Sequence, residues 1–376
     1  MKKLEKSVPV IRFKGFSEAW EQRKFIEIIN RLSKTSNSSI LPKVEYEDII
    51  AEEGRLNKDI SNKFDSRKGI LFQPKNILYG KLRPYLKNWL YPDFKGVAVG
   101  DFWVFEAIEA TPRFIYNLIQ SDSYQKVAND TAGTKMPRSD WTKVSNSSFF
   151  IPKESSEQKR IGTFFKQLDD TIALHQRKLD TLKQMKKGLL QQMFPKSEED
   201  VPKIRFADFD EEWYQRKLGE EFEKINERND GSFGKTHWIS VAKMYFVEPN
   251  KVLSNNIDTR TYVMRKGDIA FEGHSNTDFK FGRFVANDIG PGIVSELFPV
   301  YRHKTNYDNN YWKNAIQLEH IMAPIYSKSI TSSGNSSNKL DSKHFLNQKI
   351  YIADFEEQEK IGSIFKQLDN TIILYQ

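Results

Sequence analysis

Residues 157–176 read EQKRIGTFFKQLDDTIALHQ, and residues 357–376 read EQEKIGSIFKQLDNTIILYQ. Thirteen of these 20 positions are identical, at an offset of 200 residues. A second match lies upstream of each segment. Residues 8–25, VPVIRFKGFSEAWEQRKF, and residues 201–218, VPKIRFADFDEEWYQRKL, share 11 of 18 positions at an offset of 193. Two matches at nearly the same offset indicate that the chain is a tandem duplication.

Residues 157–194 have the spacing of a long helix with a heptad seam. Seam positions recur alternately four and three residues apart, eight of the ten are apolar, and Pro195 ends the pattern. A helix of this length spans about 57 Å. The seam of the first copy comprises Ile161, Phe165, Leu168, Ile172, His175, Leu179, Leu182, Lys186, Leu189 and Met193, and that of the second Ile361, Phe365, Leu368, Ile372 and Tyr375. Since Tyr375 replaces His175, we interpret His175 as a packed seam residue and not as a ligand.

The order of segments along the chain predicts how the two helices pair. If the seams pack together, the second helix must run antiparallel to the first, and the two globular segments lie at opposite ends of a rigid rod. Such spacing is typical of dimeric DNA-binding proteins. A second helix as long as the first would end near residue 394, about 18 residues beyond Gln376. We therefore expect part of the first seam to be covered by another subunit or by a longer natural chain; the seam residues expected to lack partners are Leu179, Leu182, Leu189 and Met193.

Between the matched ends the two copies diverge. Each has a strand-rich centre, residues 69–106 and 261–302, followed by helical stretches such as 112–129 and 311–327. Residues 96–106 and 292–302 are each expected to form a buried strand, and residues 76–80 parallel residues 268–273. The predicted fold class is therefore α+β, with two similar mixed domains. Matched ends around divergent central segments favour two domains that recognise different targets. The alternative is neutral drift of the central segments.

Composition narrows the class of protein. The chain has 376 residues, 38% hydrophobic and 29% charged, which predicts a folded protein of two domains. Its net charge of +8 favours an anionic partner such as nucleic acid, although a mildly basic protein without one is the alternative. It has no cysteine, no signal-peptide pattern and no apolar run long enough to cross a membrane. We expect a cytoplasmic protein.

A search for catalytic motifs finds none that is complete. Residues 231–236, GSFGKT, resemble a phosphate-binding loop but have two residues between the glycines where four are needed. The six histidines show no pairing at helical metal-ligand spacing. There is no N-P-P-Y or D-P-P-Y sequence and no G-x-G-x-x-G. We predict no catalytic site, no metal site and no cofactor in this chain.

Candidate DNA contacts are cations and small residues in two loops of each copy. Long donors on a shaped surface can read base edges, and small basic loops suit phosphate contact. For each of these residues an ordinary solvated side chain is the alternative, and Trp89 and Trp103 are expected to be core residues. The candidates are Lys81, Arg83, Tyr85, Lys87, Gly133, Thr134, Lys135 and Arg138 in the first copy, and His274, Asn276, Lys280, Arg283 and Lys339 in the second, with Lys339 corresponding roughly to Lys135.

The chain resembles the specificity (S) subunit of type I restriction-modification systems. The resemblance is carried by the two copies of EQxxIGxxFKQLDxTI, at 157–172 and 357–372, and by the heads WEQRK, 20–24, and WYQRK, 213–217. GTKMP at 133–137 supports it. The second copy departs from the pattern in its short helix and in lacking a clean GTKMP.

The resemblance implies a non-catalytic, DNA-reading subunit. Residues 1–153 and 197–353 would be target recognition domains, each reading half of a split site, and residues 154–196 and 354–376 would be the conserved helices. Two methyltransferase subunits would dock on these helices, and restriction subunits would join the larger complex. S-adenosylmethionine, ATP and Mg²⁺ would act in the partner subunits.

Two other classes of function remain open on the residues alone. An independent nuclease or methyltransferase would turn over DNA as a purified chain. A protein scaffold would be indifferent to the loss of basic residues from its domains.

Overall fold

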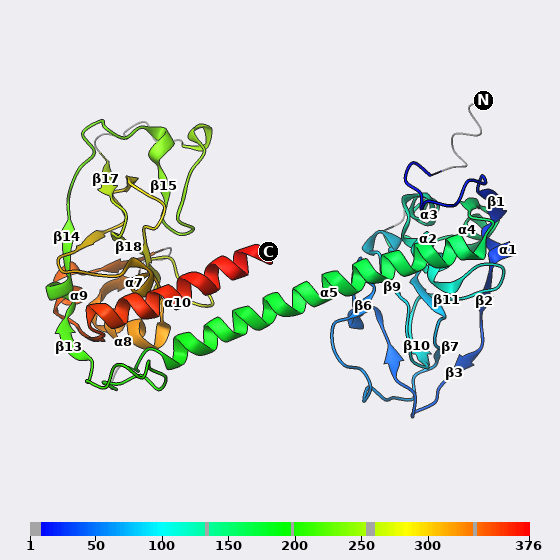
Figure 1. Ribbon diagram of the computed structural model, residues 1–376, viewed down its shortest axis with the longest axis horizontal. Coiled ribbons are helices and arrows are strands. Elements are labelled where there is room, and N and C mark those ends of the chain that lie inside the picture. The colour runs from blue at the N-terminus through cyan, green and yellow to red at the C-terminus, as the bar shows by residue number, and fades with distance from the viewer. Residues whose placement is uncertain (1–8, 132–134, 197–198, 253–259, 334–336) are drawn as a thin grey trace. The chain divides into compact units, whose positions relative to one another are not determined.

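The computed structural model describes residues 9–131, 135–196, 199–252, 260–333 and 337–376 (Figure 1). The chain divides into two compact units, with unit 1 spanning residues 1–173 and unit 2 spanning residues 174–376. The boundary falls inside the helix α5, Ser155–Gln192, which covers most of the segment predicted to be helical. The expectation of mixed α and β structure is confirmed.

The centre of unit 1 is an antiparallel four-stranded sheet with the order β2-β11-β8-β9. Side chains alternate across a strand, so β11 contributes to two cores. Trp103 and Phe105 pack with the helices, whereas Phe102 and Val104 pack toward a second sheet. The strands of the central sheet are β2 (Ile29–Leu32), β11 (Phe102–Ala107), β8 (Ile77–Gly80) and β9 (Trp89–Leu90).

The second sheet of unit 1 has the order β3-β7-β10-β4, in which β10 and β4 are parallel. Its strands are β3 (Thr35–Ser36), β7 (Gly69–Phe72), β10 (Gly96–Ala98) and β4 (Lys43–Val44). The helices are α1 (Phe25–Ile28), α2 (Pro112–Gln120), α3 (Asp122–Ala128) and α4 (Trp141–Asn146), with 3-10 turns η1 (Tyr46–Asp48) and η2 (Pro84–Leu86). Two further pairs are β1 (Glu21–Lys24) with β12 (Ser148–Ile151), and β5 (Ile49–Ile50) with β6 (Arg55–Leu56).

Unit 2 repeats the central sheet in the same strand order, β14-β21-β18-β19. Its strands alternate between two cores in the same way, since Phe271 packs with the helices and Ala270 packs on the opposite side. The two diverged middles thus share a frame. The strands are β14 (Phe222–Ile225), β21 (Val300–His303), β18 (Ile269–Glu272) and β19 (Arg283–Ala286).

The remaining elements of unit 2 are strand pairs and short helices around this sheet. The pairs are β13 (Tyr214–Lys217) with β24 (Lys349–Ile352), β17 (Thr261–Met264) with β20 (Gly292–Ser295), β15 (Ile239–Ser240) with β16 (Tyr245–Phe246), and β22 (Ile330–Ser333) with β23 (Asn338–Leu340). The helices are α6 (Leu218–Glu221), α7 (Asn309–Ala315), α8 (Glu319–Ser329), α9 (Ser342–Asn347) and α10 (Phe355–Leu374), with 3-10 turns η3 (Lys235–His237) and η4 (Pro249–Lys251).

The prediction of one buried strand at residues 96–106, and one at 292–302, was wrong. Each segment forms two strands that belong to different sheets, β10 and β11 in unit 1 and β20 and β21 in unit 2. In unit 1 the chain turns at Gly100, whose φ of +101° lies in the region that favours glycine. The apolar composition of these segments concealed the turn because both strands are buried.

The two matched ends of each copy contact one another. In unit 1 the guanidinium of Arg12 donates to both carboxylate oxygens of Glu157, at 2.7 and 2.8 Å. In unit 2 Arg205 donates to Glu357 in the same way, at 2.8 Å for both bonds, and the indole N–H of Trp213 donates to it at 3.0 Å. Both carboxylates are buried. The match between the copies therefore lies where the domain head is tied to the start of its helix.

The next conserved positions hold the helix against the domain. Gln158 accepts from the backbone amide of Thr111 at 2.8 Å and donates to the carbonyl of Pro152 at 2.9 Å. Gln358 makes the equivalent pair of bonds in unit 2. A Cβ at Gly162 would lie 2.8 Å from a side-chain carbon of Arg113, and one at Gly362 would overlap a carboxylate. Both glycines allow this close approach.

The second half of α5 packs against α10 within unit 2 (Figure 1). Lys186 pairs with Asp369 at 2.5 Å, and the rings of Phe194 and Phe365 lie 6.1 Å apart. Near the middle of α5, the ring of His175 lies 5.4 Å from the ring of Tyr375, which follows the end of α10. Residues late in α5 thus meet residues early in α10, so the two helical segments run in opposite directions.

The expectation about which seam residues lack a partner was wrong. Of the four residues named, the structure buries Leu179 and Met193 and half-buries Leu182 and Leu189. The exposed apolar residues of the seam lie in the first half of the helix, and they are Phe165, Leu168 and Ile172. His175, just past the middle of the helix, is exposed as well. The reason is that α10 runs antiparallel to α5. The start of α10 therefore packs on the end of α5, and α10 stops before it reaches the beginning of α5.

We expect half-buried His303 to make unit 2 sensitive to acid. Its ring stacks on Tyr307, 3.8 Å between centroids, and both ring nitrogens are buried without a hydrogen-bond partner in the described chain. Burial lowers the pKa of His303 to about 3. The unfolded histidine binds a proton near pH 6.5 and the folded one does not, so stability present above pH 6.5 is lost as the pH falls toward 3.

We expect the variant His303→Phe to weaken this pH dependence. Between pH 7 and pH 5.5 the wild type should lose about 1 kcal/mol more unfolding free energy than the variant. Urea denaturation of both proteins at the two pH values measures the difference. Equal losses would contradict the assignment, because the other titrating groups are common to both proteins.

Candidate nucleic-acid interface

The two candidate loops of unit 1, distant in sequence, are joined in the structure. The first follows β8 and contains η2, and the second precedes α4. The backbone amide of Ser139 donates to the carbonyl of Lys81 at 2.8 Å, and that of Arg83 donates to the carbonyl of Pro137 at 2.7 Å. Leu82 and Arg138 form an antiparallel bridge between them. The loops thus form one surface.

Two residues that the sequence analysis missed hold this surface together. The carboxylate of Asp101 pairs with Arg138 at 3.0 Å and with Lys81 at 3.6 Å. The hydroxyl of Tyr46 donates to the carbonyl of Asp101 at 2.6 Å and accepts from the amide of Leu82 at 3.0 Å. Hydrogen bonding from Arg138 lowers the pKa of Asp101, so this carboxylate stays charged. No sequence signal joins residues so far apart along the chain.

Arg83 has the most available donors of the unit 1 candidates. It is exposed, and its side chain makes no hydrogen bond or ion pair with the described residues. Its φ of +49° is a strained conformation for a residue with a side chain, and such strain gathers at functional sites. Beside it Tyr85 is 55% exposed, whereas Lys87 pairs with Glu52 at 3.1 Å.

The remaining residues that the sequence singled out in unit 1 divide into three groups. Lys135 is exposed and, like Arg83, makes no ion pair within the described chain. Gly133 and Thr134 lie outside the described residues. Trp89 and Trp103 are buried, so the expectation that they are core residues is confirmed.

Unit 2 joins the equivalent pair of segments. The backbone amide of Asn338, in β23, donates to the carbonyl of Gly273, directly after β18, at 2.9 Å. Its side-chain amide donates to Ser275 at 3.0 Å. A Cβ at Gly273 would overlap the backbone of Asn338, so glycine allows the strands to meet. Both copies therefore build a surface where the end of the third sheet strand meets the segment before the last short helix.

The two copies can be aligned on the aspartates that cap these short helices. Asp140 accepts from backbone amides at the start of α4, and Asp341 accepts at the start of α9. Counting back two residues from each cap aligns Lys339 with Arg138. The sequence had suggested that Lys339 corresponds roughly to Lys135, which lies three positions earlier than Arg138.

The unit 2 candidates differ in how free their side chains are. Arg283 donates to the carbonyl of Ala242 at 2.5 Å and lies over the ring of Phe279. The amide oxygen of Asn276 accepts from the two backbone amides of a turn. The imidazole of His274 hydrogen-bonds to Glu272. These three side chains support the loop, and the candidates left exposed without ion pairs in the described chain are Lys280 and Lys339.

The structure shows how residues 231–236, the segment that resembles a phosphate-binding loop, are held. Residues 231–236 lead into a single 3-10 turn, and the side chain of Asn229 holds the loop through the amides of Gly231 and Phe233. No group of three or more His, Asp or Glu in the described chain is arranged to hold a metal ion. No helix among these residues is long and apolar enough to cross a membrane.

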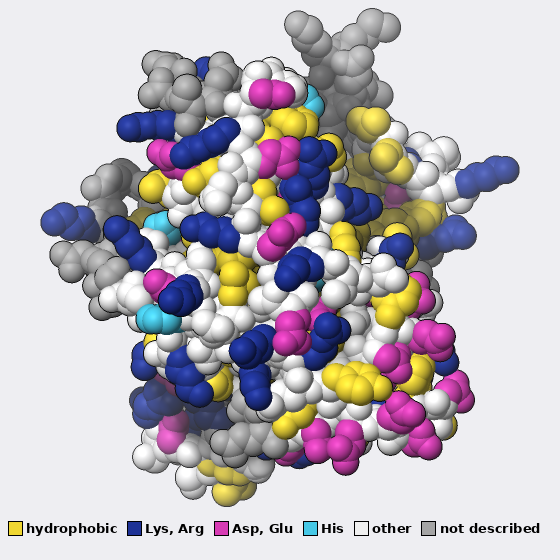
Figure 2. Space-filling view, turned by 90° about the vertical axis from the view of Figure 1, so that its left-hand side faces the viewer, with side chains coloured by type: hydrophobic (Ala, Val, Ile, Leu, Met, Phe, Trp, Pro, Cys, Tyr) yellow, Lys and Arg dark blue, Asp and Glu magenta, His cyan; other side chains and the backbone are white. Residues whose placement is uncertain are grey.

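Charge alone does not outline the interface. Figure 2 shows Lys and Arg side chains spread over most of one face, while Asp and Glu gather toward its lower right edge. A basic surface supports binding to phosphates without selecting a sequence. The specific part of the interface must therefore be sought in the joined loops.

Comparison with known proteins places this fold. Residues 17–184 match the family model of the type I restriction modification DNA specificity domain. The S subunit of the type I restriction-modification system from M. genitalium matches at 14% identity, with 98% of this chain and 93% of that chain covered and a TM-score of 0.56. A chain solved in work on complex assembly and conformational transition of the type I R-M system matches at 17% identity, covering 97% and 93%, with a TM-score of 0.52.

The HsdS subunit from Thermoanaerobacter tengcongensis matches at 19% identity, covering 95% and 90%, with a TM-score of 0.47. No curated protein sequence matches the chain. The chain shares the fold of the M. genitalium S subunit and of the chain from the type I R-M work. The resemblance seen in the sequence is confirmed by the match of residues 17–184 to this family model.

Proposed function

We propose that this chain is the sequence-reading subunit of a type I restriction-modification complex and catalyses no reaction itself. The proposal rests on a contact between two loops that occurs in both copies, which we call the loop junction. In both copies the segment after the third sheet strand is tied to the segment before the last short helix, and each junction presents exposed cations. Two different surfaces on one repeated frame suit the two halves of a split DNA site.

The helices would set the spacing of the two half-sites and dock two methyltransferase subunits. Their pairing in unit 2 supports an antiparallel coiled coil. His175 and Tyr375 are equivalent positions of the repeat, and they contact each other. Equivalent residues meet in this way near a twofold axis, so the contact supports a local pseudo-twofold relation between the two helical segments of unit 2.

The domain limits follow the same proposal. Residues 1–153 and 197–353 are the target recognition domains, and residues 154–196 and 354–376 are the helices between and after them. Restriction subunits join the full complex in the cytoplasm. S-adenosylmethionine, ATP and Mg²⁺ act in the partner subunits and not in this chain.

Methylome sequencing of a host with and without this chain tests the proposal. A split adenine motif should disappear when the chain is deleted and return when it is restored. Turnover of DNA by the purified chain, with S-adenosylmethionine or Mg²⁺ supplied, would instead support an independent enzyme. An unchanged methylome together with unchanged partner binding by charge-depleted domains would favour a protein scaffold.

Replacing Arg83 by Ala is expected to reduce discrimination at one half-site only. The guanidinium is free to contact a base edge, and losing such a contact costs about 1–3 kcal/mol of discrimination. Competition binding by the chain with its methyltransferase partner, using DNA with either half-site scrambled, measures the effect. Lys95→Ala, an exposed cation at the other end of β10 from Asp101, is the control. A uniform loss across all sequences would assign Arg83 to phosphate contact.

A further inference from the structure

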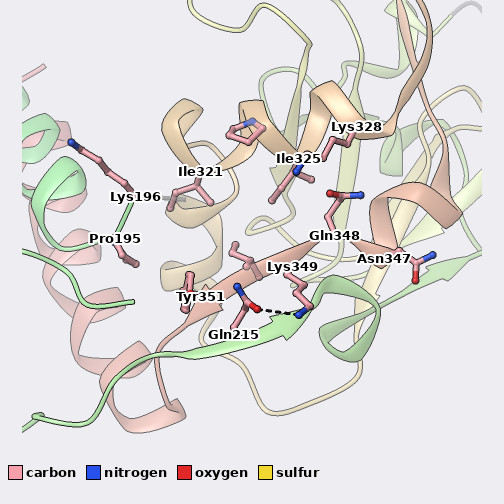
Figure 3. A pocket seen from close by; sticks show the side chains of 12 residues that line it. Pro195, Lys196, Gln215, Ile321, Ile325, Lys328, Asn347, Gln348, Lys349 and Tyr351 are labelled. Atoms are coloured by element: carbon pink, nitrogen blue, oxygen red, sulfur yellow. Dashed lines mark hydrogen bonds between the residues drawn. The ribbon is translucent and has the colours of Figure 1, made fainter. Parts of the chain in front are cut away.

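A cleft of about 400 Å³ lies within unit 2 where the chain leaves α5 (Figure 3). Pro195 and Lys196 form one side, one face of α8 forms another, and β24 with Gln215 of β13 completes it. None of the candidate DNA-contact residues lines it. The cleft is therefore a separate feature from the loop junction of this unit.

Three cations surround the cleft, and no carboxylate lines it among the described residues. They are Lys196, Lys328 and Lys349, and none forms an ion pair within the described chain. Lys349 donates only to the neutral side chain of Gln215, at 3.1 Å. Glu199 is close by, where its carboxylate accepts from the backbone amide of Lys196 at 3.4 Å. The cleft retains an excess of positive charge.

The position of Lys349 adds to this excess. It stands directly opposite Lys217 in the antiparallel pair of β13 and β24. Like charges in this position destabilise a strand pair. At the equivalent place in unit 1, Lys24 stands opposite Ser148, so only the second copy has the charged pair. The pair of facing lysines is unfavourable in the free chain and occurs in one copy only. An anionic ligand would relieve this repulsion.

The surface between the lysines is mixed, with polar side chains such as Asn347 and Gln348 beside apolar ones. Its apolar part is presented mainly by half-buried Pro324 of α8 and Tyr351 of β24. Three further apolar residues of the lining are largely buried in the core, and they are Ile321, Ile325 and Ile350. A DNA backbone offers phosphates and sugars but no apolar side chain to fill such a surface. A peptide can supply both an acidic group and an apolar anchor, which is the usual composition of a small protein-binding cleft.

We propose that this cleft docks an acidic peptide segment of a partner protein, with one apolar side chain of the segment seated between α8 and β24. The inference rests on the proposed function, because the partner that we use to test it is the methyltransferase subunit. Docking at this place would fix the partner beside the end of α5 at the second copy only. The two ends of the repeat would then differ in how they hold their partners.

Charge reversal with a matched control tests the proposal. The triple variant Lys196→Glu, Lys328→Glu, Lys349→Glu and the control Lys224→Glu, Lys266→Glu, Lys343→Glu change the net charge equally at exposed lysines of unit 2. Affinity for the purified methyltransferase subunit is measured by calorimetry in low salt. We expect a loss of about tenfold or more for the cleft variant, because repulsion replaces attraction, and little change for the control.

Carbodiimide cross-linking of the unmodified proteins is an independent measurement. It joins lysine directly to carboxylate, so links from Lys196, Lys328 or Lys349 to Asp or Glu of the methyltransferase subunit are expected. Equal binding by all variants, or links only from other lysines, would overturn the inference and leave the proposed function standing. Loss of DNA binding alone would show that phosphates occupy the cleft. No binding by the wild type would overturn both proposals.

Discussion

The variant Glu357→Ala should lower the unfolding free energy of unit 2 by about 3–5 kcal/mol, because removing one partner of a buried ion pair leaves the other charge uncompensated. Glu357 is 0% exposed, and it accepts two hydrogen bonds from Arg205 and one from the indole of Trp213. All three donors lose their acceptor in the variant. The head of the second domain would also lose its attachment to the start of α10.

Denaturant unfolding followed by tryptophan fluorescence measures this effect, since Trp213 reports directly on the site. Glu359→Ala, two residues along the same helix, is the control, because Glu359 is exposed and makes no ion pair within the described chain. The double variant Arg205→Met, Glu357→Leu should recover part of the loss, since an apolar pair of similar volume needs no charge compensation. A loss below about 1 kcal/mol for Glu357→Ala would assign the pair to a surface-like, screened interaction.

Phe365→Ala and Phe165→Ala should have very different effects, although the two residues are equivalent positions of one repeat. Phe365 is 0% exposed and packs with Phe194 and the core of unit 2, whereas Phe165 is 43% exposed. Emptying a buried phenylalanine site costs about 3–5 kcal/mol. A substitution at an exposed site usually changes stability by about 0.5 kcal/mol or less.

This pair is its own control, because the residue, the substitution and the flanking sequence FKQLD are the same. Thermal and urea unfolding of both variants and the wild type measure the difference. Similar losses for the two variants would mean that the first half of α5 is packed in solution. The structural account of the seam, in which Phe165 is exposed while Phe365 is buried, would then be wrong.

The duplication and the long helix could be predicted from the sequence because both depend on local pattern. A heptad seam and a repeated string of letters are visible without knowing what they touch. The direction of the second helix follows from connectivity as well. The direction alone does not say which half of the first seam is covered. That depends also on the register in which the two helices pack, and the contact between Lys186 and Asp369 gives this register.

The candidate interface was predicted only in part. The sequence indicated Arg83 and Lys135 as residues of separate loops, and chain folding joined their loops through backbone hydrogen bonds. It also indicated Arg283, whose guanidinium is bound to a carbonyl of the same unit. Availability of a side chain depends on its neighbours in space, and residue type and spacing do not contain that information.

By itself, the sequence determined that one domain and one helix occur twice, that the helices carry heptad seams, and that no complete catalytic motif is present. Only the tertiary structure decided why the ends of each copy match: Arg12 meets Glu157 and Arg205 meets Glu357, about 150 residues apart along the chain. Local periodicity is set by hydrogen bonding within a helix or strand. Long-range pairing is set by packing of the whole domain, so it leaves no local pattern to read.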